Sequence, residues 1–235
     1  MNARPITPTS PAATLREGRD GFGNSLHLLV VNTRHQEIEL TATGTVETED
    51  RAGVVLGLLE AVPLRVHLRR TGLTQATPAI AALTSAGPGA DIIPWLHTLM
   101  DAIRDRVEYL PGVTSAETTA AEALAAGRGV CQDHAHIFIA AARLAGIPAR
   151  YVTGYLLTGE ATHAVAHHAW SEAYVDGLGW LGFDVANRLC PTDHYVRLSA
   201  GLDAHHAAPI RGSRRGGAGE SLAVEVNVAA AAGQQ

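Results

Sequence analysis

The sequence of residues 127–156 is GRGVCQDHAHIFIAAARLAGIPARYVTGYL, and this stretch decides how the chain is interpreted. A glycine-rich turn precedes Cys131, and glycine allows the backbone to bend sharply there. Residues 131–145 are apolar on most sides, which is typical of a buried helix. A Gly-Ile-Pro segment ends that helix, and residues 149–157 have strand character. The stretch therefore predicts a cysteine at the first position of a buried helix that is followed by a strand.

A second informative stretch, residues 168–187, is HAWSEAYVDGLGWLGFDVAN. Two strand-like runs flank an Asp-Gly pair, which predicts a β-hairpin. A turn centred on residue 176 would place His168 and Asp184 beside each other on adjacent strands. They share a face only if the loop has an odd length or the hairpin contains a bulge. We expect Asp184 to accept a hydrogen bond from Nδ1 of His168, which leaves Nε2 for the Cys131 thiol.

A thiol, an imidazole and a carboxylate are the parts of a cysteine-dependent acyl-transfer site. The positive end of the helix dipole and a nearby imidazolium both stabilise a thiolate at Cys131. The backbone N–H of Cys131 is the expected donor to the oxyanion that forms on attack. Two structural alternatives stay open from these residues alone. Cys131 could be a buried helix cap, and His168 with Asp184 could be a polar cross-strand pair.

The remaining patterns predict a mixed α+β organisation. Residues 1–20 are rich in Pro, Thr, Ser and Ala, and we expect them to be poorly ordered. A helix is expected from Asp91 onward, and a capping box at Thr119 predicts a second, short helix. Strands are expected within residues 22–46 and at 149–157, 169–175, 179–184, 195–199 and 221–228. We divide the chain into an N-terminal β-rich region with a disordered start, residues 1–75, and a catalytic core, residues 76–235.

Composition excludes several classes of protein. The chain has 235 residues, a hydrophobic share of 46% and a net charge of −5, which describe an ordinary globular protein and disfavour nucleic acid and anionic membranes. Its one basic block, Arg211 to Arg215, is short for a nucleic-acid surface. No run reaches the ~18 apolar residues of a membrane span, and the first residues lack a signal-peptide core. We expect a cytoplasmic protein whose two cysteines, Cys131 and Cys190, are free.

A metal site is an alternative use of the histidines near Cys131. His134, His136, His163 and His167 are the candidates. His134 and His136 are two residues apart on a helix, so their side chains do not face each other. The set contains a single His-x-x-x-His pair, His163 and His167, and no Cys-x-x-Cys pair, which falls short of the ligands of common zinc sites. We therefore expect neither a metal nor another cofactor.

Separated motifs in this order resemble the bacterial transglutaminase-like proteins, a family that includes proteins assigned as cysteine proteases. The matching pieces are Tyr109 to Thr114, Gly129 to Asp133, Gly146 to Tyr155, His168-Ala169-Trp170 with Glu172 and Tyr174, Gly182-Phe183-Asp184 with Asn187, Gly201 to Asp203, and Pro209 to Gly212. The resemblance covers roughly residues 20–230. It implies a papain-like transglutaminase core, in which the helix with Cys131 at its N-terminus packs on an antiparallel sheet.

The resemblance also implies roles for the three residues: Cys131 as the nucleophile, His168 as the base and Asp184 as the carboxylate that orients it. It implies an N-terminal β domain as well, which is small and apparently shortened in this chain because a Pro/Thr-rich segment stands where members carry further strands.

The expected function is thiol-dependent acyl transfer on an amide or peptide substrate through an acyl-thioester. Water as the acceptor gives a protease or amidase, and an amine gives a transglutaminase-like reaction. The chain lacks an Asp-x-Asp-x-Asp-Gly calcium loop, which disfavours a calcium-activated cross-linking enzyme. The expected partner is a peptide, a protein or a small amide. The alternative is a catalytically inactive scaffold or binding module that keeps the fold.

Overall fold

A computed structural model describes residues 2–228 of the chain, except residues 4–6, 11–13, 59, 90, 158–164, 218 and 220. The helices are η1 (Leu64–Leu68, a 3-10 helix), α1 (Pro78–Leu83), α2 (Ile92–Arg106), α3 (Ala120–Ala126) and α4 (Cys131–Leu144). The strands are β1 (Asn2–Ala3), β2 (Thr7–Ser10), β3 (Thr14–Arg19), β4 (Ser25–Val30), β5 (Glu39–Thr41), β6 (Gly44–Thr45), β7 (Val54–Val55), β8 (Glu108–Tyr109), β9 (Arg128–Gly129), β10 (Ala149–Leu157), β11 (Val165–Val175), β12 (Gly179–Phe183) and β13 (Tyr195–Gly201).

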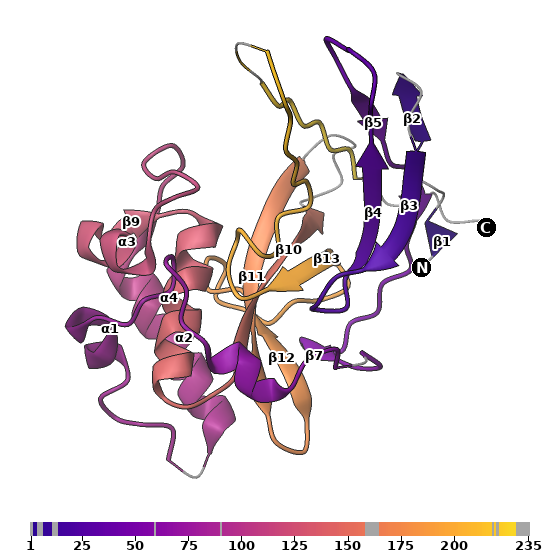
Figure 1. The fold of residues 1–235 in the computed structure, drawn as a ribbon. Coiled ribbons are helices and arrows are strands. Elements are labelled where there is room, and N and C mark those ends of the chain that lie inside the picture. Colours follow the sequence, from indigo (N-terminus) through magenta and orange to yellow (C-terminus); the bar gives the residue numbers. More distant parts are fainter. Residues whose placement is uncertain are drawn as a thin grey trace.

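A five-stranded antiparallel sheet, in the order β13-β10-β11-β12-β7, forms the centre of the molecule. The helices gather on one side of it, and the hairpins near the N-terminus stand on the other side (Figure 1). A bulge between Thr153 and Gly154 shifts the pairing of β10 with β13. Gly154 is required there, because a Cβ would lie 2.1 Å from the Val196 carbonyl oxygen. The predicted α+β fold, a cysteine-bearing helix on an antiparallel sheet, is confirmed.

Helix α4 is the buried centre of the core, as its composition predicts. Its residues from Asp133 to Arg143 are all buried. Phe138 stacks on Phe183 of β12, with ring centroids 5.0 Å apart. Burying a large apolar side chain stabilises the fold by about 1.5–3 kcal/mol each. The packing therefore fixes α4 against the sheet, and with it the position of the helix N-terminus.

The helices around α4 follow the local signals in part. Thr119 and Glu122 form the expected capping box at the start of α3, and Gly127 ends that helix with φ 66°. Asp91 precedes α2, but its side chain makes no capping hydrogen bond. Neither η1 nor α1 is predicted from the sequence. Both are shorter than two turns, so their apolar residues show no measurable period.

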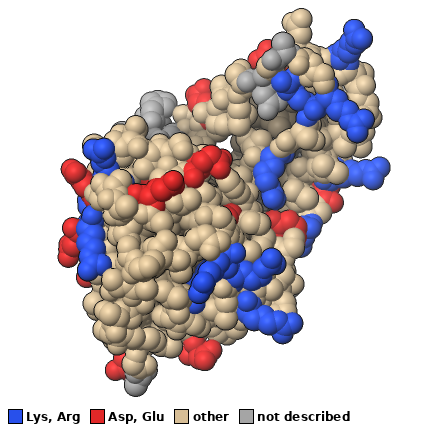
Figure 2. Space-filling model, turned by 60° about the vertical axis from the view of Figure 1, so that its left-hand side comes forward, with Lys and Arg blue, Asp and Glu red and all other residues tan. Residues whose placement is uncertain are grey.

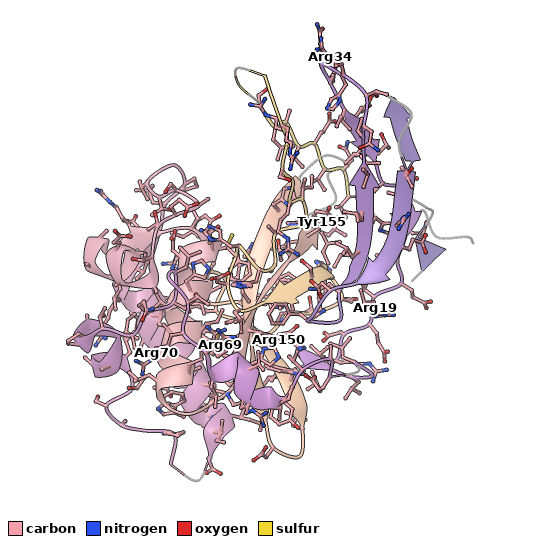
Figure 3. All side chains as sticks on the ribbon, in the orientation of Figure 1. Arg19, Arg34, Arg69, Arg70, Arg150 and Tyr155 are labelled. Atoms are coloured by element: carbon pink, nitrogen blue, oxygen red, sulfur yellow. The ribbon has the colours of Figure 1, made fainter. Side chains whose placement is uncertain are left out.

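A buried ionic cluster joins three strands of the central sheet. Glu172 of β11 is fully buried and accepts hydrogen bonds from Arg150 Nε of β10 at 2.6 Å and from Arg197 Nε of β13 at 2.8 Å. The Arg150 guanidinium also lies over the Trp180 ring, 3.8 Å from its centroid. Arg150 lies at one end of β10 and Tyr155 toward the other (Figure 3). The single buried carboxylate therefore links β10, β11 and β13 through two arginines.

The hairpin of β3 and β4 reaches into residues 1–20, the segment for which poor order is expected. β3 pairs with β4 over six residue pairs from Thr14 to Arg19, residues 1, 4–6 and 11–13 lie outside the described part, and poor order before Thr14 stays a prediction. Asn24, in the turn, holds this hairpin to β13, since its side chain bonds both the N–H and the carbonyl of Ala200. Residues 221–228 were expected to form a strand, but the structure contains none there. Alternation alone does not make a strand without an edge to pair with.

No helix among the described residues has both the length and the apolar character needed to span a membrane. The division of the chain at residue 75 stays a prediction, and the structure adds one detail to it. Strand β7 lies before that boundary and pairs with β12 of the central sheet.

Candidate active site

Cys131 is the first residue of α4, and a tight local structure determines its position. The strand pair β8–β9 is parallel and leads directly into the turn before the helix. The Asp133 carboxylate folds back, so that Oδ2 accepts from the Val130 N–H at 2.7 Å and from the Thr114 hydroxyl at 2.7 Å. Gly129 is required for this cap, because a Cβ would lie 2.7 Å from Asp133 Oδ2. The glycine provides space for the carboxylate that closes the helix start.

His168 and Asp184 lie in direct contact. His168 is on β11, and Asp184 follows β12 in an isolated bridge with Leu189. His168 Nε2 and Asp184 Oδ2 are 2.6 Å apart, and the side chains are 6% and 0% exposed. The expected proximity of the two residues is therefore present.

The expected nitrogen assignment is wrong. Nε2, not Nδ1, meets the carboxylate, which leaves Nδ1 for the thiol. The reason is the hairpin turn, which has an odd length but is centred one residue later than expected. The ladder begins at Val175 opposite Gly179 and ends at Ser171 opposite Phe183, so its next position opposite Asp184 is Trp170. Asp184 therefore approaches His168 diagonally, and the nitrogen farther from the backbone spans that longer distance.

The surroundings of His168 favour its protonated form. Burial by itself lowers the pKa of His168, but the hydrogen bonds with Asp184 and with the Cys131 thiol, and the charges of both groups, raise it to about 9. The ring therefore has a fixed ionic partner in Asp184. A protonated imidazole carries the charge that stabilises a nearby thiolate.

Asp184 Oδ2 is the acceptor for three donors. Besides His168 Nε2, the Tyr195 hydroxyl donates to it at 2.6 Å and Asn187 Nδ2 at 2.7 Å. Burial acts to raise the pKa of Asp184, but these hydrogen bonds and the His168 charge lower it on balance. The carboxylate therefore stays ionised and keeps a fixed orientation next to the imidazole.

Tyr195 is the site residue that sequence reasoning missed. Its ring lies 5.8 Å from the His168 ring and 5.5 Å from the Trp170 ring, measured between centroids. Burial and Asp184 both raise its pKa far above the ordinary value, so it stays a donor. The only signal in the sequence is an aromatic residue at the start of a predicted strand. It reaches the site because β13 pairs with β10, which places Tyr195 opposite Leu156.

The histidines considered for a metal site are separated. His134 and His136 are buried within α4, and His167 is exposed beside Tyr155. His163 lies outside the described residues. Within the described part of the chain, no three His, Cys, Asp or Glu side chains gather as metal ligands would. Both Cys131 and Cys190 are free, and burial raises the pKa of the Cys190 thiol.

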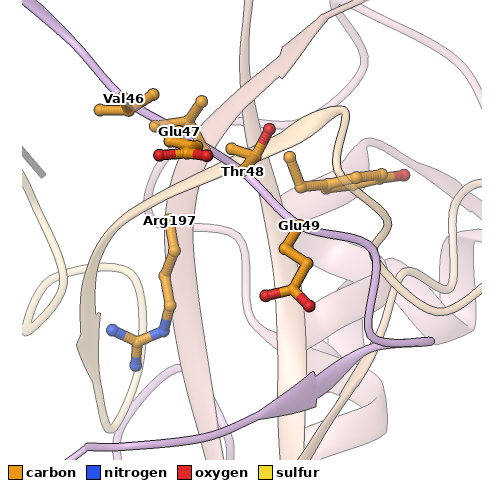
Figure 4. A pocket seen from close by; sticks show the side chains of 7 residues that line it. Val46, Glu47, Thr48, Glu49 and Arg197 are labelled. Atoms are coloured by element: carbon orange, nitrogen blue, oxygen red, sulfur yellow. The ribbon is translucent and has the colours of Figure 1, made fainter.

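A pocket of about 220 Å³ lies between residues 46–49 and β13 (Figure 4). Tyr195 and Arg197 line it from the strand, and Glu47 and Glu49 line it from the N-terminal segment. Tyr195 therefore takes part both in this pocket and, through its hydroxyl, in the hydrogen bonds to Asp184.

Residues 79–185, which include all three candidate residues, match the family model of the transglutaminase-like superfamily. The chain carries a transglutaminase-like domain. The structure resembles that of a protein from Cytophaga hutchinsonii described as a putative cysteine protease, with a TM-score of 0.63 and 25% identity over 88% of this chain and 74% of that one. Uncharacterized proteins of Mycobacterium leprae and Mycobacterium tuberculosis are each 28% identical to the chain. Their alignments cover 94% and 89% of this chain, and 83% and 75% of the relatives.

Proposed function

We propose that the protein is a cysteine-dependent acyl-transfer enzyme that acts on an amide or peptide bond. The observation that carries the proposal is the 2.6 Å contact of His168 Nε2 with the buried Asp184 carboxylate, together with a His168 pKa that Asp184 and the Cys131 thiol both raise. The transglutaminase-like domain and the cysteine-protease name of the Cytophaga hutchinsonii protein support the same reaction class.

The first half of the reaction forms an acyl-thioester. The Cys131 thiolate attacks the carbonyl carbon of the substrate, and a C–S bond forms as the carbonyl oxygen becomes an oxyanion. The imidazolium of His168 gives its Nδ1 proton to the leaving nitrogen, the C–N bond breaks, and an amine departs. Asp184 holds the ring through Nε2 throughout, so that Nδ1 stays directed toward the reacting groups.

The second half transfers the acyl group to an acceptor. Neutral His168 takes a proton from water or from an amine, which attacks the thioester carbonyl and releases the Cys131 thiolate. The two acceptors give hydrolysis or transamidation. All 18 basic residues of the chain are arginines, so the protein has no lysine of its own to act as acceptor. A transamidation would therefore use an amine supplied by another molecule.

A burst assay with an activated ester tests the proposal. We expect a rapid release of one equivalent of leaving group per enzyme, because acylation of a thiolate is faster than hydrolysis of the thioester. Cys131→Ala should abolish the burst, and the matched control Cys190→Ser should keep it. Added primary amine should raise the steady-state rate if the acceptor site takes amines, and leave it unchanged if the enzyme is a hydrolase. Absence of a burst in the unmodified protein, or a burst in Cys131→Ala, contradicts the proposal.

The proposed substrate is a peptide, a protein or a small amide, and the proposed location is the cytoplasm. Nucleic acid is not proposed as a partner. On the face drawn in Figure 2, arginines form several separate groups with acidic side chains between them, whereas a nucleic-acid surface presents a continuous basic area.

A further inference from the structure

The peptide that joins Val130 to Cys131 carries the expected oxyanion donor, the Cys131 N–H. The first N–H groups of a helix have no acceptor within the helix, so this group is available to a substrate. A trans peptide is planar, and its C=O and N–H point in opposite directions. Whatever holds the Val130 carbonyl therefore also sets the direction of the Cys131 N–H.

His134 holds that carbonyl. Its Nδ1 lies 2.8 Å from the Val130 oxygen, and its backbone N–H donates to the same oxygen at 3.1 Å. Its Nε2 lies 3.0 Å from the Val107 oxygen, at the C-terminal end of α2. The side chain is fully buried, and the Tyr109 ring stacks over it with centroids 6.2 Å apart.

Both ring nitrogens thus face carbonyl oxygens, which can only accept hydrogen bonds. Each contact requires a proton on the nitrogen that makes it. The Nδ1 contact is the one that bears on the site. A neutral ring carries one proton: on Nδ1 that proton donates to the peptide that carries the Cys131 N–H, and on Nε2 it donates to the Val107 oxygen of α2.

The residue Val130 is also held through the preceding peptide, which joins it to Gly129. Its own N–H donates to Asp133 Oδ2, and the Thr114 hydroxyl donates to the same oxygen. Asp133 and His134 therefore fix Val130 at both its N–H and its C=O. A hydrogen bond accepted by a peptide carbonyl also polarises the N–H of that peptide, which strengthens it as a donor.

We propose that His134 is a positioning residue for the oxyanion site. Through Nδ1 it orients the Cys131 N–H toward the oxygen that becomes negative when the thioester forms, and it polarises that N–H. The inference rests on the proposed function, since an oxyanion forms only in acyl transfer. In this role His134 stabilises the tetrahedral intermediate that carries the oxyanion. It does not change the fraction of Cys131 that is present as the attacking thiolate.

Two reactions of the same thiol separate these effects. Acylation by an activated ester passes through an oxyanion, whereas alkylation by iodoacetamide displaces iodide at a tetrahedral carbon and forms none. Removing an oxyanion donor costs about 10²–10³ in rate, and a donor that is present but misdirected should cost less, about tenfold to a hundredfold. We expect His134→Leu to slow acylation by that factor and to change alkylation by less than about threefold.

Asparagine and glutamine provide the matched pair of variants. The side-chain N–H of asparagine takes the place of Nδ1 and can donate to the Val130 oxygen. That of glutamine takes the place of Nε2 and can donate only to the Val107 oxygen. We expect His134→Asn to acylate at nearly the rate of the unmodified protein and His134→Gln to stay slow. His136→Asn is the control on the same helix, because that ring accepts from the Ala204 N–H and does not contact Val130.

The outcomes distinguish the two proposals. If the unmodified protein gives no acylation burst, the proposed function fails. If it does, and His134→Gln acylates as fast as His134→Asn, the positioning role is refuted. Equal losses of acylation and alkylation in both variants also refute it, because they indicate damage to the thiolate or to the fold. Should His134→Leu fail to fold, as judged by circular dichroism, the asparagine and glutamine variants still decide.

Discussion

Replacing Asp184 with Asn should shift the pH dependence of the reaction by a predictable amount. His168 has a pKa of about 9 against an ordinary value of 6.5. The difference between the two values corresponds to roughly 3 kcal/mol in favour of the imidazolium. Asp184 and Cys131 share this effect. Asparagine keeps an acceptor oxygen but removes the charge, so the pKa of His168 should fall by at least about one unit.

The direction of the pH dependence follows from the step that needs the proton. Because the imidazolium protonates the leaving group, the rate is highest below the pKa of His168 and decreases as the pH rises through that value. The alkaline limb of kcat/KM for acylation should therefore lie near pH 9 in the unmodified protein. In Asp184→Asn it should lie near pH 8 or lower, with the maximum rate reduced about a hundredfold or more.

The assay is the pH profile of acylation by an anilide, whose leaving nitrogen takes the proton, and Asp176→Asn is the control, since Asp176 is an exposed residue at the tip of the same hairpin. An alkaline limb that stays near pH 9 in Asp184→Asn would refute the reasoning, because Asp184 would then not hold the proton on His168. An equal shift in the Asp176→Asn control would also refute it.

Three further predictions follow from the buried polar groups. Tyr195→Phe removes one donor to the buried carboxylate and should slow acylation about tenfold to a hundredfold, consistent with about 1.5–3 kcal/mol for a hydrogen bond to a charge, while Tyr155→Phe should not; equal rates in both variants would contradict the role. Glu172→Gln leaves buried arginine charge uncompensated and should lower the free energy of unfolding in urea by about 3–5 kcal/mol; a loss below about 1 kcal/mol would show that the cluster is not stabilising. Burial, aided by nearby positive charge, lowers the pKa values of His67 and His136 to about 4. The unfolded state therefore binds more protons than the folded state between pH 6.5 and pH 4, and the free energy of unfolding should decrease as the pH is lowered through that window. Thermal unfolding across that range checks this, and a flat curve would contradict it.

The local part of the site could be predicted from the sequence. The turn into α4, the helix itself and the hairpin that carries His168 are set by neighbouring residues, whose glycine placement and periodicity are visible in the chain. The order of Cys131, His168 and Asp184 gave the proximity of the last two. The predicted contact between His168 Nδ1 and the carboxylate was wrong. A turn centred on residue 177 instead of 176 changes the residue opposite Asp184, and with it the imidazole nitrogen that contacts the carboxylate.

The long-range part could not be predicted. Tyr195 reaches Asp184 only because β13 pairs with β10 with a bulge at Gly154, and no local pattern encodes that pairing. Residues 221–228 also depend on a long-range partner: their alternation is that of a strand, but no strand edge pairs with them. The sequence shows Asp133 only as part of a motif. Its role as a cap depends on the absence of a Cβ at Gly129, which appears only in three dimensions.

The central claim is that Cys131 forms a covalent thioester with the substrate, and one measurement tests it most directly. The protein is mixed with an activated ester, quenched in acid within the burst, digested and analysed by mass spectrometry. We expect the acyl mass on the peptide that contains Cys131, at close to one equivalent, and on no other cysteine peptide. An acyl group carried by Cys190, or none on either cysteine while leaving group is released, would contradict the account.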